Sequence, residues 1–215
     1  MKITQTADKS STLYSSQFEE HYHSVNGAVS ESLHIFIDAG FNFIDKNEIN
    51  VLEIGFGTGL NAILTYEQAK LSEKIIFYDA IELYPAEFDV IKKLNFHETA
   101  NINNEVFLQM HKLSWNEKHK ITQDFIFRKV QNDLLKIDFA NKYDLIYFDA
   151  FSPETQPEMW TEKVFTKIYN SMNTGGILTT YSSKGIVKQA LRNSGFTVKR
   201  LPGPKGKRHI LRAVK

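Results

Sequence analysis

The sequence predicts an α/β fold with a mostly parallel sheet that ends in an antiparallel hairpin. An almost wholly apolar segment, "INVLEIG" (49–55), has the composition of a buried parallel strand and runs into closely spaced glycines. Strand-like and helix-like segments then alternate along the chain. At the end, "TVKRLPGP" (197–204) and "RHILRAVK" (208–215) face each other across a turn. A chain of 215 residues suits one such domain with a short N-terminal addition.

The first part of the chain is expected to pack on the outside of this domain. Residues 1–24 are polar and predict an extended arm. Residues 29–44 predict a helix, because their apolar side chains suit a helical face and Ser30 is a suitable cap. We therefore divide the chain into an N-terminal arm and helix, residues 1–48, and a main domain, residues 49–215.

The other elements follow from hydrophobic periodicity and from residues that begin or end helices. Pro85 is expected in the first turn of its helix, and Gly195 is expected to close the last helix. Within the less clear region 103–142, only 124–133 alternates like a strand. The expected strands are 49–55, 74–83, 124–133, 143–151, 175–183, 197–204 and 208–215, and the expected helices are 60–71, 85–94, 159–172 and 185–196.

Composition excludes several classes of protein. No apolar run approaches the roughly 18 residues that a membrane-spanning helix needs, and residues 1–20 lack the hydrophobic core of a secretory signal. The chain has no cysteine, which removes disulfides and thiolate chemistry and predicts a cytoplasmic protein. No metal site is predicted, because His21, His23 and His34 do not form a ligand set with an acidic partner.

Charge is unevenly distributed along the chain. Residues 163–215 hold 12 of the 26 Lys and Arg residues and none of the 25 Asp and Glu residues. The net charge of +1 therefore combines an acidic first part with a basic last part. A basic region of this kind indicates a nucleic-acid partner, the alternative being a solvated surface without a partner.

The glycines of "VLEIGFGTGLN" (51–61) follow the first main strand and precede a helix, where a loop can hold a nucleotide-like ligand. Dinucleotide sites use G-x-G-x-x-G, whereas Gly55, Gly57 and Gly59 run G-x-G-x-G after an acidic residue, Glu53. A carboxylate there suits the ammonium of S-adenosylmethionine and would repel a pyrophosphate. The predicted cofactor is therefore S-adenosylmethionine, with Asn61 as a further contact.

Acidic residues after later strands suggest how the rest of this cofactor is held. Glu82 ends the second main strand, 23 residues after Gly59, and can accept hydrogen bonds from both ribose hydroxyls. Asp79 is the alternative for that role. Asp133 lies where methyltransferases that use this cofactor often recognise the adenine amino group, although a role as a helix cap explains the residue equally well. Leu134 would then pack on the adenine ring.

Asp149 is the predicted catalytic residue. The expected strand 143–151 leaves its apolar run at Asp149, so this residue should point into the same crevice as the glycines. An amine acceptor arrives as ammonium and must lose a proton, which a carboxylate can accept. The alternative is that Asp149 only contacts the cofactor or caps the next turn. Phe151, Pro153 and Trp160 are candidates for the wall of the acceptor site, and they are equally suited to the core.

Several segments together resemble a known family, namely "LEIGFGTGLN", "DAFSPETQPEMWT", "GGILTTYSSKGIVKQALRNSGF" and "GPKGKRHIL". They are similar to the methyltransferase domain of the bifunctional tRNA 5-methylaminomethyl-2-thiouridine biosynthesis (MnmC) family. "SSQFEEHYHSVNGAVSESLHIF" also matches that domain's opening pattern, so the resemblance runs from about Tyr14 to the end. His209 departs from the pattern, because relatives tend to carry an acidic residue there.

The resemblance implies a Rossmann-like methyltransferase fold with an N-terminal extension. It also implies methyl transfer from S-adenosylmethionine to the exocyclic amine of 5-aminomethyl-2-thiouridine at the tRNA wobble position. The fused family members carry a second, FAD-dependent domain, and its absence from these 215 residues implies a stand-alone methyltransferase. By this match, the cofactor and active-site motifs contain Glu53, Gly55, Gly57, Glu82, Asp133 and Asp149, and a substrate-side motif contains Tyr22, Asn26, Gly27 and Glu31.

The basic last part of the chain independently fits a tRNA partner. Proteins grip RNA mainly through its phosphates, while an unstacked base is recognised in a pocket. Lys205, Lys207 and Arg208 lie in a loop that we expect to contact the anticodon arm. Three alternatives remain: a small-amine methyltransferase or aminopropyltransferase, an NAD-dependent dehydrogenase, and a non-catalytic tRNA-binding module.

Overall fold

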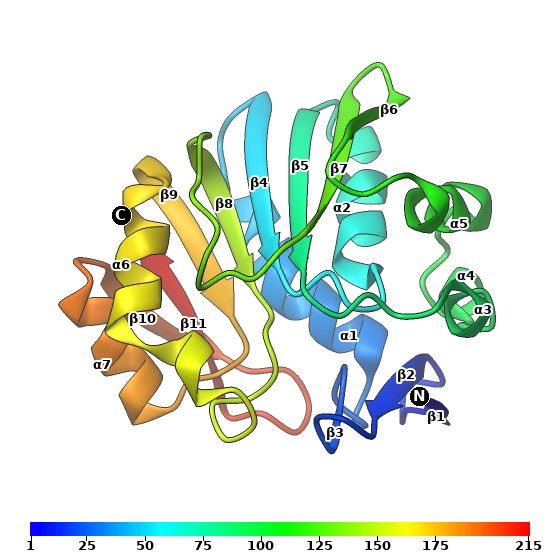
Figure 1. Cartoon of the computed structure of the whole chain (residues 1–215), viewed down its shortest axis with the longest axis horizontal. Coiled ribbons are helices and arrows are strands. Elements are labelled where there is room, and N and C mark those ends of the chain that lie inside the picture. The colour runs from blue at the N-terminus through cyan, green and yellow to red at the C-terminus, as the bar shows by residue number, and fades with distance from the viewer.

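A computed structural model describes all 215 residues of the chain. Its main feature is an eight-stranded sheet (Figure 1). The strands are β4 Glu48–Ile54, β5 Ile75–Glu82, β6 Lys118–Thr122, β7 Phe125–Gln131, β8 Tyr143–Phe148, β9 Met172–Thr180, β10 Thr197–Pro202 and β11 His209–Val214. Their spatial order is β10-β11-β9-β8-β4-β5-β7-β6.

The direction of the strands confirms the predicted fold class. The five central strands, from β9 to β7, run parallel to one another. Strand β6 and the β10–β11 hairpin form antiparallel edges. Helix α2 Leu60–Leu71 lies behind the sheet in Figure 1, and α6 Glu162–Asn170 and α7 Gly185–Asn193 lie in front of it. The chain is therefore an α/β domain with helices on both faces of its sheet.

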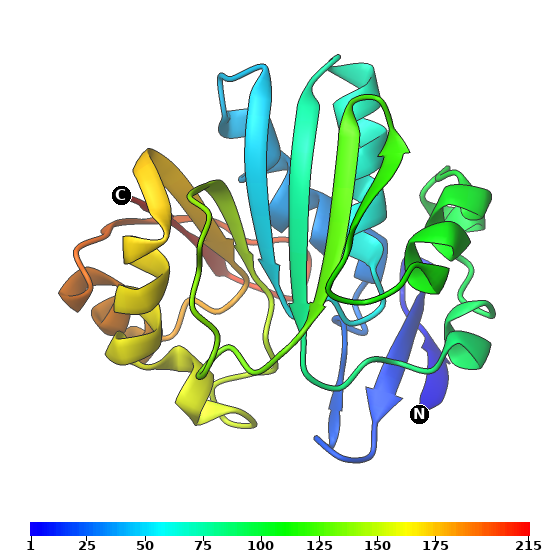
Figure 2. The ribbon, with the colours of Figure 1, turned by 45° about the horizontal axis from the view of Figure 1, so that its top comes forward.

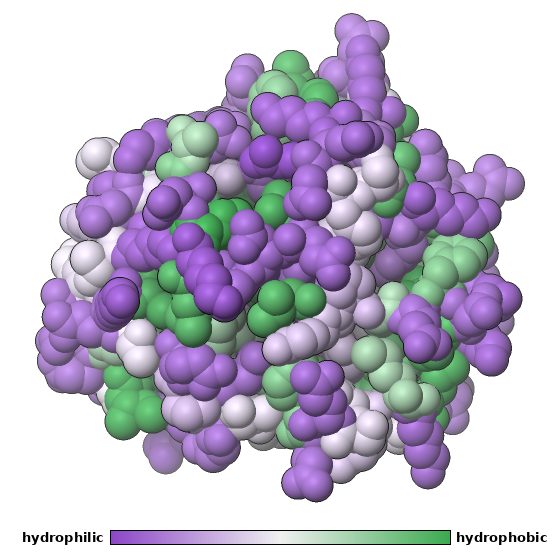
Figure 3. Space-filling view, in the orientation of Figure 1, coloured by the Kyte–Doolittle hydropathy of each residue, from purple (hydrophilic) through white to green (hydrophobic).

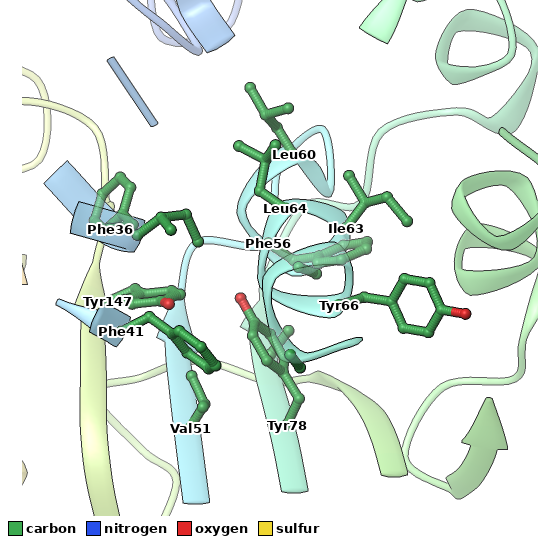
Figure 4. Packing of buried hydrophobic residues seen from close by; sticks show 14 of the residues in the cluster. Phe36, Phe41, Val51, Phe56, Leu60, Ile63, Leu64, Tyr66, Tyr78 and Tyr147 are labelled. Carbon is green, nitrogen blue, oxygen red and sulfur yellow. The ribbon is translucent and has the colours of Figure 1, made fainter. Parts of the chain in front are cut away.

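Each face of the sheet buries its own hydrophobic cluster. Behind the sheet, α2 and residues 33–43 pack on β4, β5 and β8, and the rings of Phe36 and Tyr147 lie 5.1 Å apart (Figure 4). In front, α6 and α7 cover β8 and β9, where Phe148 and Phe165 pack with ring centres 5.0 Å apart. Full burial of a large apolar side chain contributes about 1.5–3 kcal/mol, so these clusters fix the strands whose ends form the site.

Residues 1–24 are not the extended arm that their polarity predicted. They form an antiparallel sheet of β1 Lys2–Gln5, β2 Ser11–Ser15 and β3 Glu20–His21. Polar groups pair locally, since Asp8 accepts hydrogen bonds from Thr6, Ser10 and the amide of Ser30. This pairing lets polar residues be buried without loss of hydrogen bonds. Figure 2 shows the small sheet beyond the carboxyl ends of the central strands.

The predicted helix 29–44 forms as three separate pieces. These are α1 Ala28–Ser32, a π-helical segment Leu33–Asp38 and a 3₁₀ turn Phe41–Phe43. Ile35, Phe36 and Ile37 are all buried. Three successive buried side chains do not fit one apolar stripe of an α-helix, and the wider π-helical turn accommodates them.

Other predicted elements differ at their boundaries. Of the expected helix 85–94, only α3 Phe88–Ile91 forms, because Glu87 has extended backbone angles and Pro85 lies outside the helix. Helix α6 begins after Thr161, whose hydroxyl caps it, and Met172 already belongs to β9. The unassigned middle of the chain contains α4 Phe96–Thr99, α5 Asn104–Lys112 and β6. Gly195 follows α7 at φ 101°, as expected of a terminating glycine.

Candidate functional site

A cavity of about 340 Å³ lies beyond the carboxyl ends of β4, β5, β7 and β8. Ligands bind in this position in open α/β sheets, because the loops that leave the strands converge there, and the volume suits a small molecule. Residues 18–25, α1 and the loop between β10 and β11 complete its walls. The predicted residues that line it are Tyr22, Glu31, Gly55, Gly57, Asn61, Glu82, Asp133, Leu134, Asp149, Phe151 and Lys207.

The glycine loop forms one side of the cavity. The amides of Gly55 and Phe56 donate to the carbonyl of Ile81, which ties the loop to β5. Gly55 has φ 89°, and a Cβ there would lie 2.6 Å from the carbonyl oxygen of Asp149. Gly57 also has positive φ and lies against the ring of Tyr22. Gly59 lines no part of the cavity; it begins α2 at φ 73°, where a Cβ would meet the ring of His111.

Asn61 connects the buried carboxyl group of Glu53 with the half-buried one of Asp149. Its Nδ2 atom donates to Oε1 of Glu53 at 3.0 Å and to Oδ2 of Asp149 at 2.9 Å. Glu53 also accepts from the hydroxyl of Tyr78 at 2.9 Å. Glu53 is fully buried and does not line the cavity. It therefore holds Asn61 in place and does not itself reach the cavity.

Burial changes the acidity of both carboxyl groups. It raises the pKa of Asp149 to about 7, the hydrogen bond from Asn61 opposes the rise, and the charge of Glu31 adds to it. It also raises the pKa of Glu53 well above its usual range, an effect that the charge of Asp149 increases. A carboxyl group with a pKa near neutrality can both release and accept a proton under physiological conditions. Asp149 thus has the position and the acidity of a general base.

The structure separates the two candidates for ribose binding. Glu82 lines the cavity, where its two oxygens accept from the amides of Gly57 and Tyr84, each at 2.9 Å. Asp79 lies outside the cavity and pairs with Arg128 at 2.6 Å. It also accepts a hydrogen bond from the hydroxyl of Tyr143 at 2.7 Å. Each oxygen of Glu82 keeps an acceptor site for a ligand hydroxyl, whereas Asp79 is committed to internal pairs.

Asp133 and Leu134 lie at the edge of the cavity nearest β7. Oδ1 of Asp133 accepts from the amide of Leu135 at 2.9 Å, so the residue caps a turn while it also lines the cavity. Leu134 is buried among the residues of the front face. The position of Asp133 is thus compatible with recognition of the adenine amino group and with a role as a cap.

Aromatic rings form another part of the cavity wall. Phe18 stacks on Phe151 with ring centres 4.5 Å apart, and Tyr22 meets Phe151 edge-on at 5.0 Å. Trp160 is buried in the front cluster and donates from Nε1 to the carbonyl of Phe151. Trp160 and the buried Pro153 do not line the cavity, so they support the wall from behind.

The remaining N-terminal residues occupy three different environments. Asn26 packs against Gly206 of the β10–β11 loop, where a Cβ would lie 2.1 Å from its amide nitrogen. Gly27 begins α1 at φ 148°. Glu31 alone reaches the cavity, where Oε2 lies 3.6 Å from Nζ of Lys207. Neither Asn26 nor Gly27 lines the cavity.

The three basic residues of the β10–β11 loop are not equivalent. Lys205 and Arg208 are exposed and lie outside the cavity. Lys207 is half-buried, lines the cavity and lies over the ring of Tyr181, with Nζ 5.0 Å from the ring centre. Lys207 therefore differs from its neighbours and from the surface role that its sequence position suggested.

Two histidines that the sequence did not single out for this role hold the glycine loop. His23 Nε2 hydrogen-bonds the hydroxyl of Thr58 at 2.7 Å, and His111 Nε2 hydrogen-bonds its carbonyl at 3.0 Å. Burial lowers the pKa of His23 to about 4 and that of His111 to about 3. Both rings are therefore neutral at pH 7.

The structure offers no metal site and no membrane-spanning helix. No group of three or more His, Asp or Glu side chains has the arrangement of a metal site, and no helix meets the length and hydropathy needed to cross a membrane.

The family assignment comes from residues 91–215, which match the family described as S-adenosyl-L-methionine-dependent methyltransferases. The chain belongs to this family. Curated proteins named tRNA 5-methylaminomethyl-2-thiouridine biosynthesis bifunctional protein MnmC are also similar. The one from Legionella pneumophila (strain Corby) is 30% identical over 92% of this chain and 34% of its own length. The one from Campylobacter hominis is 28% identical over 94% of this chain and 31% of its own length. The methyltransferase thus spans about a third of these relatives.

Solved structures agree with this methyltransferase fold. MnmC2 from Aquifex aeolicus superposes with a TM-score of 0.80 at 23% identity and covers 99% of this chain and 69% of that one. DesVI from Streptomyces venezuelae gives a TM-score of 0.51 at 11% identity and covers 86% of this chain and 91% of that one. The predicted similarity to the MnmC methyltransferase domain is therefore confirmed.

The residues of this methyltransferase fit S-adenosylmethionine. Gly55 and Gly57 bring the backbone of the glycine loop to the cavity wall, in positions where a Cβ would collide with Asp149 or Tyr22. Glu82 offers carboxylate oxygens at the end of β5. Asn61 is 2% exposed, and its Oδ1 atom has no hydrogen-bond donor. An unpaired buried acceptor at the cavity wall suits a cationic or hydroxylated ligand group.

Proposed function

We propose that this methyltransferase transfers a methyl group from S-adenosylmethionine to the exocyclic amine of 5-aminomethyl-2-thiouridine at the wobble position of tRNA. The names of the similar curated proteins support this substrate. The observation that carries the proposal is the position of Asp149, a half-buried carboxyl group with a pKa of about 7 that lines the same cavity as the aromatic wall. An amine acceptor needs a base of this kind.

The side chains of the site supply proton transfer and orientation. When bound, S-adenosylmethionine supplies an electrophilic methyl group. Asp149 then accepts the proton that the acceptor ammonium must lose, and Asn61 fixes the carboxylate through its 2.9 Å hydrogen bond. Glu53 holds Asn61 from the far side. Orientation by such a fixed network lowers the entropy cost of the reaction.

The aromatic wall and the basic surface fit a nucleic-acid substrate. An unstacked base can stack on the rings of Phe18, Tyr22 and Phe151, as in other proteins that recognise flipped bases. Lys205 and Arg208 are exposed beside the cavity and can contact phosphates. Lys188, Arg192 and Arg200 form another group of neighbouring basic residues, since the charges of Arg200 and Arg192 lower the pKa of Lys188.

The test is a methylation assay with defined tRNA. Purified protein and S-adenosylmethionine are incubated with tRNA that carries 5-aminomethyl-2-thiouridine, and digested nucleosides are analysed by mass spectrometry. The proposal expects conversion to 5-methylaminomethyl-2-thiouridine and its loss in Asp149→Asn. Turnover of free alkylamines or polyamines without turnover of this tRNA would instead favour a small-amine methyltransferase. In cells that lack the protein, unchanged methylated nucleoside would contradict the proposal.

A further inference from the structure

The Lys207 side chain already places an ammonium group in the cavity. Its Nζ atom lies 3.6 Å from Oε2 of Glu31 and 5.0 Å from the centre of the Tyr181 ring. Only 27% of the Lys207 side chain and 12% of the Glu31 side chain are exposed. A carboxylate and an aromatic face on two sides of a cation are the groups that proteins use to bind alkylammonium ions.

This ammonium position belongs to the same cavity as Asp149. The charge of Glu31 raises the pKa of Asp149, and the charge of Lys207 lowers it, so all three groups interact. Tyr181 is held rigidly, because its hydroxyl donates to the carbonyl of Ala150 at 2.8 Å. The place that Lys207 occupies is therefore a preformed site for a cation beside the proposed base.

Lys207 leaves part of the hydrogen-bonding capacity of this place unused. The 3.6 Å separation from Glu31 is longer than a hydrogen bond, and Oε2 of Glu31 has no hydrogen-bond donor. A ligand ammonium with three N–H donors can satisfy acceptors that Lys207 leaves free. Displacement of Lys207 thus breaks an ion pair at Glu31, which the ammonium group of the acceptor would replace.

We propose that Lys207 occupies the subsite for the acceptor's ammonium group and must leave it when the acceptor enters. This inference rests on the proposed amine acceptor. Glu31 and the Tyr181 ring then select a primary alkylammonium group, and Lys207 is an internal competitor for their subsite. Once displaced, Lys207 joins Lys205 and Arg208 on the outer side of the loop, where a polyanionic substrate holds it.

The test measures binding of n-butylammonium, a probe without a nucleoside, by ligand-observed NMR. Lys207→Ala should bind the probe about tenfold more tightly than the wild type, because removal of an internal competitor raises the apparent affinity. Lys205→Ala is the matched control, since it removes a lysine two residues away that lies outside the cavity, and should leave probe affinity unchanged. Adding Glu31→Gln to Lys207→Ala should abolish the gain.

A second measurement uses the unaltered protein. The ¹⁵Nζ resonance of Lys207, assigned by its absence from Lys207→Ala, should shift on addition of n-butylammonium, while that of Lys205 should not. Equal probe affinity in wild type and Lys207→Ala, or a gain that survives Glu31→Gln, would overturn the inference. Neither readout involves tRNA. Suppose that the wild type does not methylate the tRNA, but Lys207→Ala binds the probe more tightly and Glu31→Gln removes this gain. That result would refute the proposed function and leave the inference about Lys207 standing.

Discussion

The side-chain amide of Asn61 donates a 2.9 Å hydrogen bond to Oδ2 of Asp149. This bond lowers the pKa of a carboxyl group that burial raises to about 7. Asn61→Ala should therefore move the midpoint of the pH–rate profile upward by about one unit and reduce the rate at pH 7. Gln68→Ala on the same helix, which does not line the cavity, is the control. An unchanged midpoint in Asn61→Ala would contradict the idea that the hydrogen bond from Asn61 sets the acidity of Asp149.

Asp149 also links activity to stability in opposite directions. As a base it must be ionised, so the rate of methyl transfer should rise with pH and level off above about 7. Its folded pKa is higher than its unfolded pKa, so its contribution to stability is present below about pH 4 and is lost as pH rises through 7. Asp149→Asn should thus be more stable than the wild type at pH 8, on the order of a few kcal/mol. Urea denaturation at pH 4 and pH 8 would measure this, and a variant equally destabilised at both would contradict it.

Gly55 and Gly185 provide a matched pair of glycine substitutions. Ala at position 55 would have an unfavourable φ of 89° and a Cβ 2.6 Å from the carbonyl oxygen of Asp149. Gly55→Ala should cost about 1–3 kcal/mol and weaken S-adenosylmethionine binding. Gly185 begins α7 with open space around it, so Gly185→Ala should be neutral or stabilise by up to about 1 kcal/mol. Thermal unfolding and isothermal titration would test both; similar losses in the two variants would exclude the steric explanation.

The two histidines on Thr58 predict an acid-sensitive loop. Their folded pKa values, about 4 for His23 and about 3 for His111, lie below the unfolded value of 6.5. The stability that they contribute is present above pH 6.5 and falls as the unfolded chain takes up protons below it. Each histidine adds about 1.4 kcal/mol of loss per pH unit in this range. His111→Leu should therefore show a weaker loss of stability than the wild type between pH 6.5 and 5, and equal slopes in urea denaturation would count against this origin.

Lys205 and Arg208 should contribute to tRNA binding through phosphates. Their double replacement by alanine should weaken tRNA binding and reduce its salt dependence by about two charges, with unchanged S-adenosylmethionine affinity. Lys118 and Lys120, on strand β6 at the opposite edge of the sheet, form the control pair. Figure 3 shows a largely hydrophilic face with scattered apolar patches. Equal effects of both pairs would indicate nonspecific charge attraction. Filter binding at several salt concentrations would distinguish the two.

The sequence predicted those parts of the site that depend on local signals. The strand before Gly55, the helix after Gly59 and the acidic end of β5 are each encoded by a short continuous pattern. Contacts between distant segments were not predictable in this way. Glu53 is turned toward Asn61 and Tyr78, and Trp160 supports Phe151 from behind, because packing across the sheet decides where each side chain points. Residues 1–24 were predicted to form an extended arm because their hydroxyl groups find their hydrogen-bond partners only after folding.

The N-terminal segment reaches the cavity through partners that are very distant along the chain. Glu20 accepts hydrogen bonds from Ser152, 132 residues away, and His34 bonds the carbonyl of Pro202, 168 residues away. Contacts across such long loops form late, because chain closure must precede them. We therefore expect refolding molecules to regain their helical circular dichroism before they can capture a ligand.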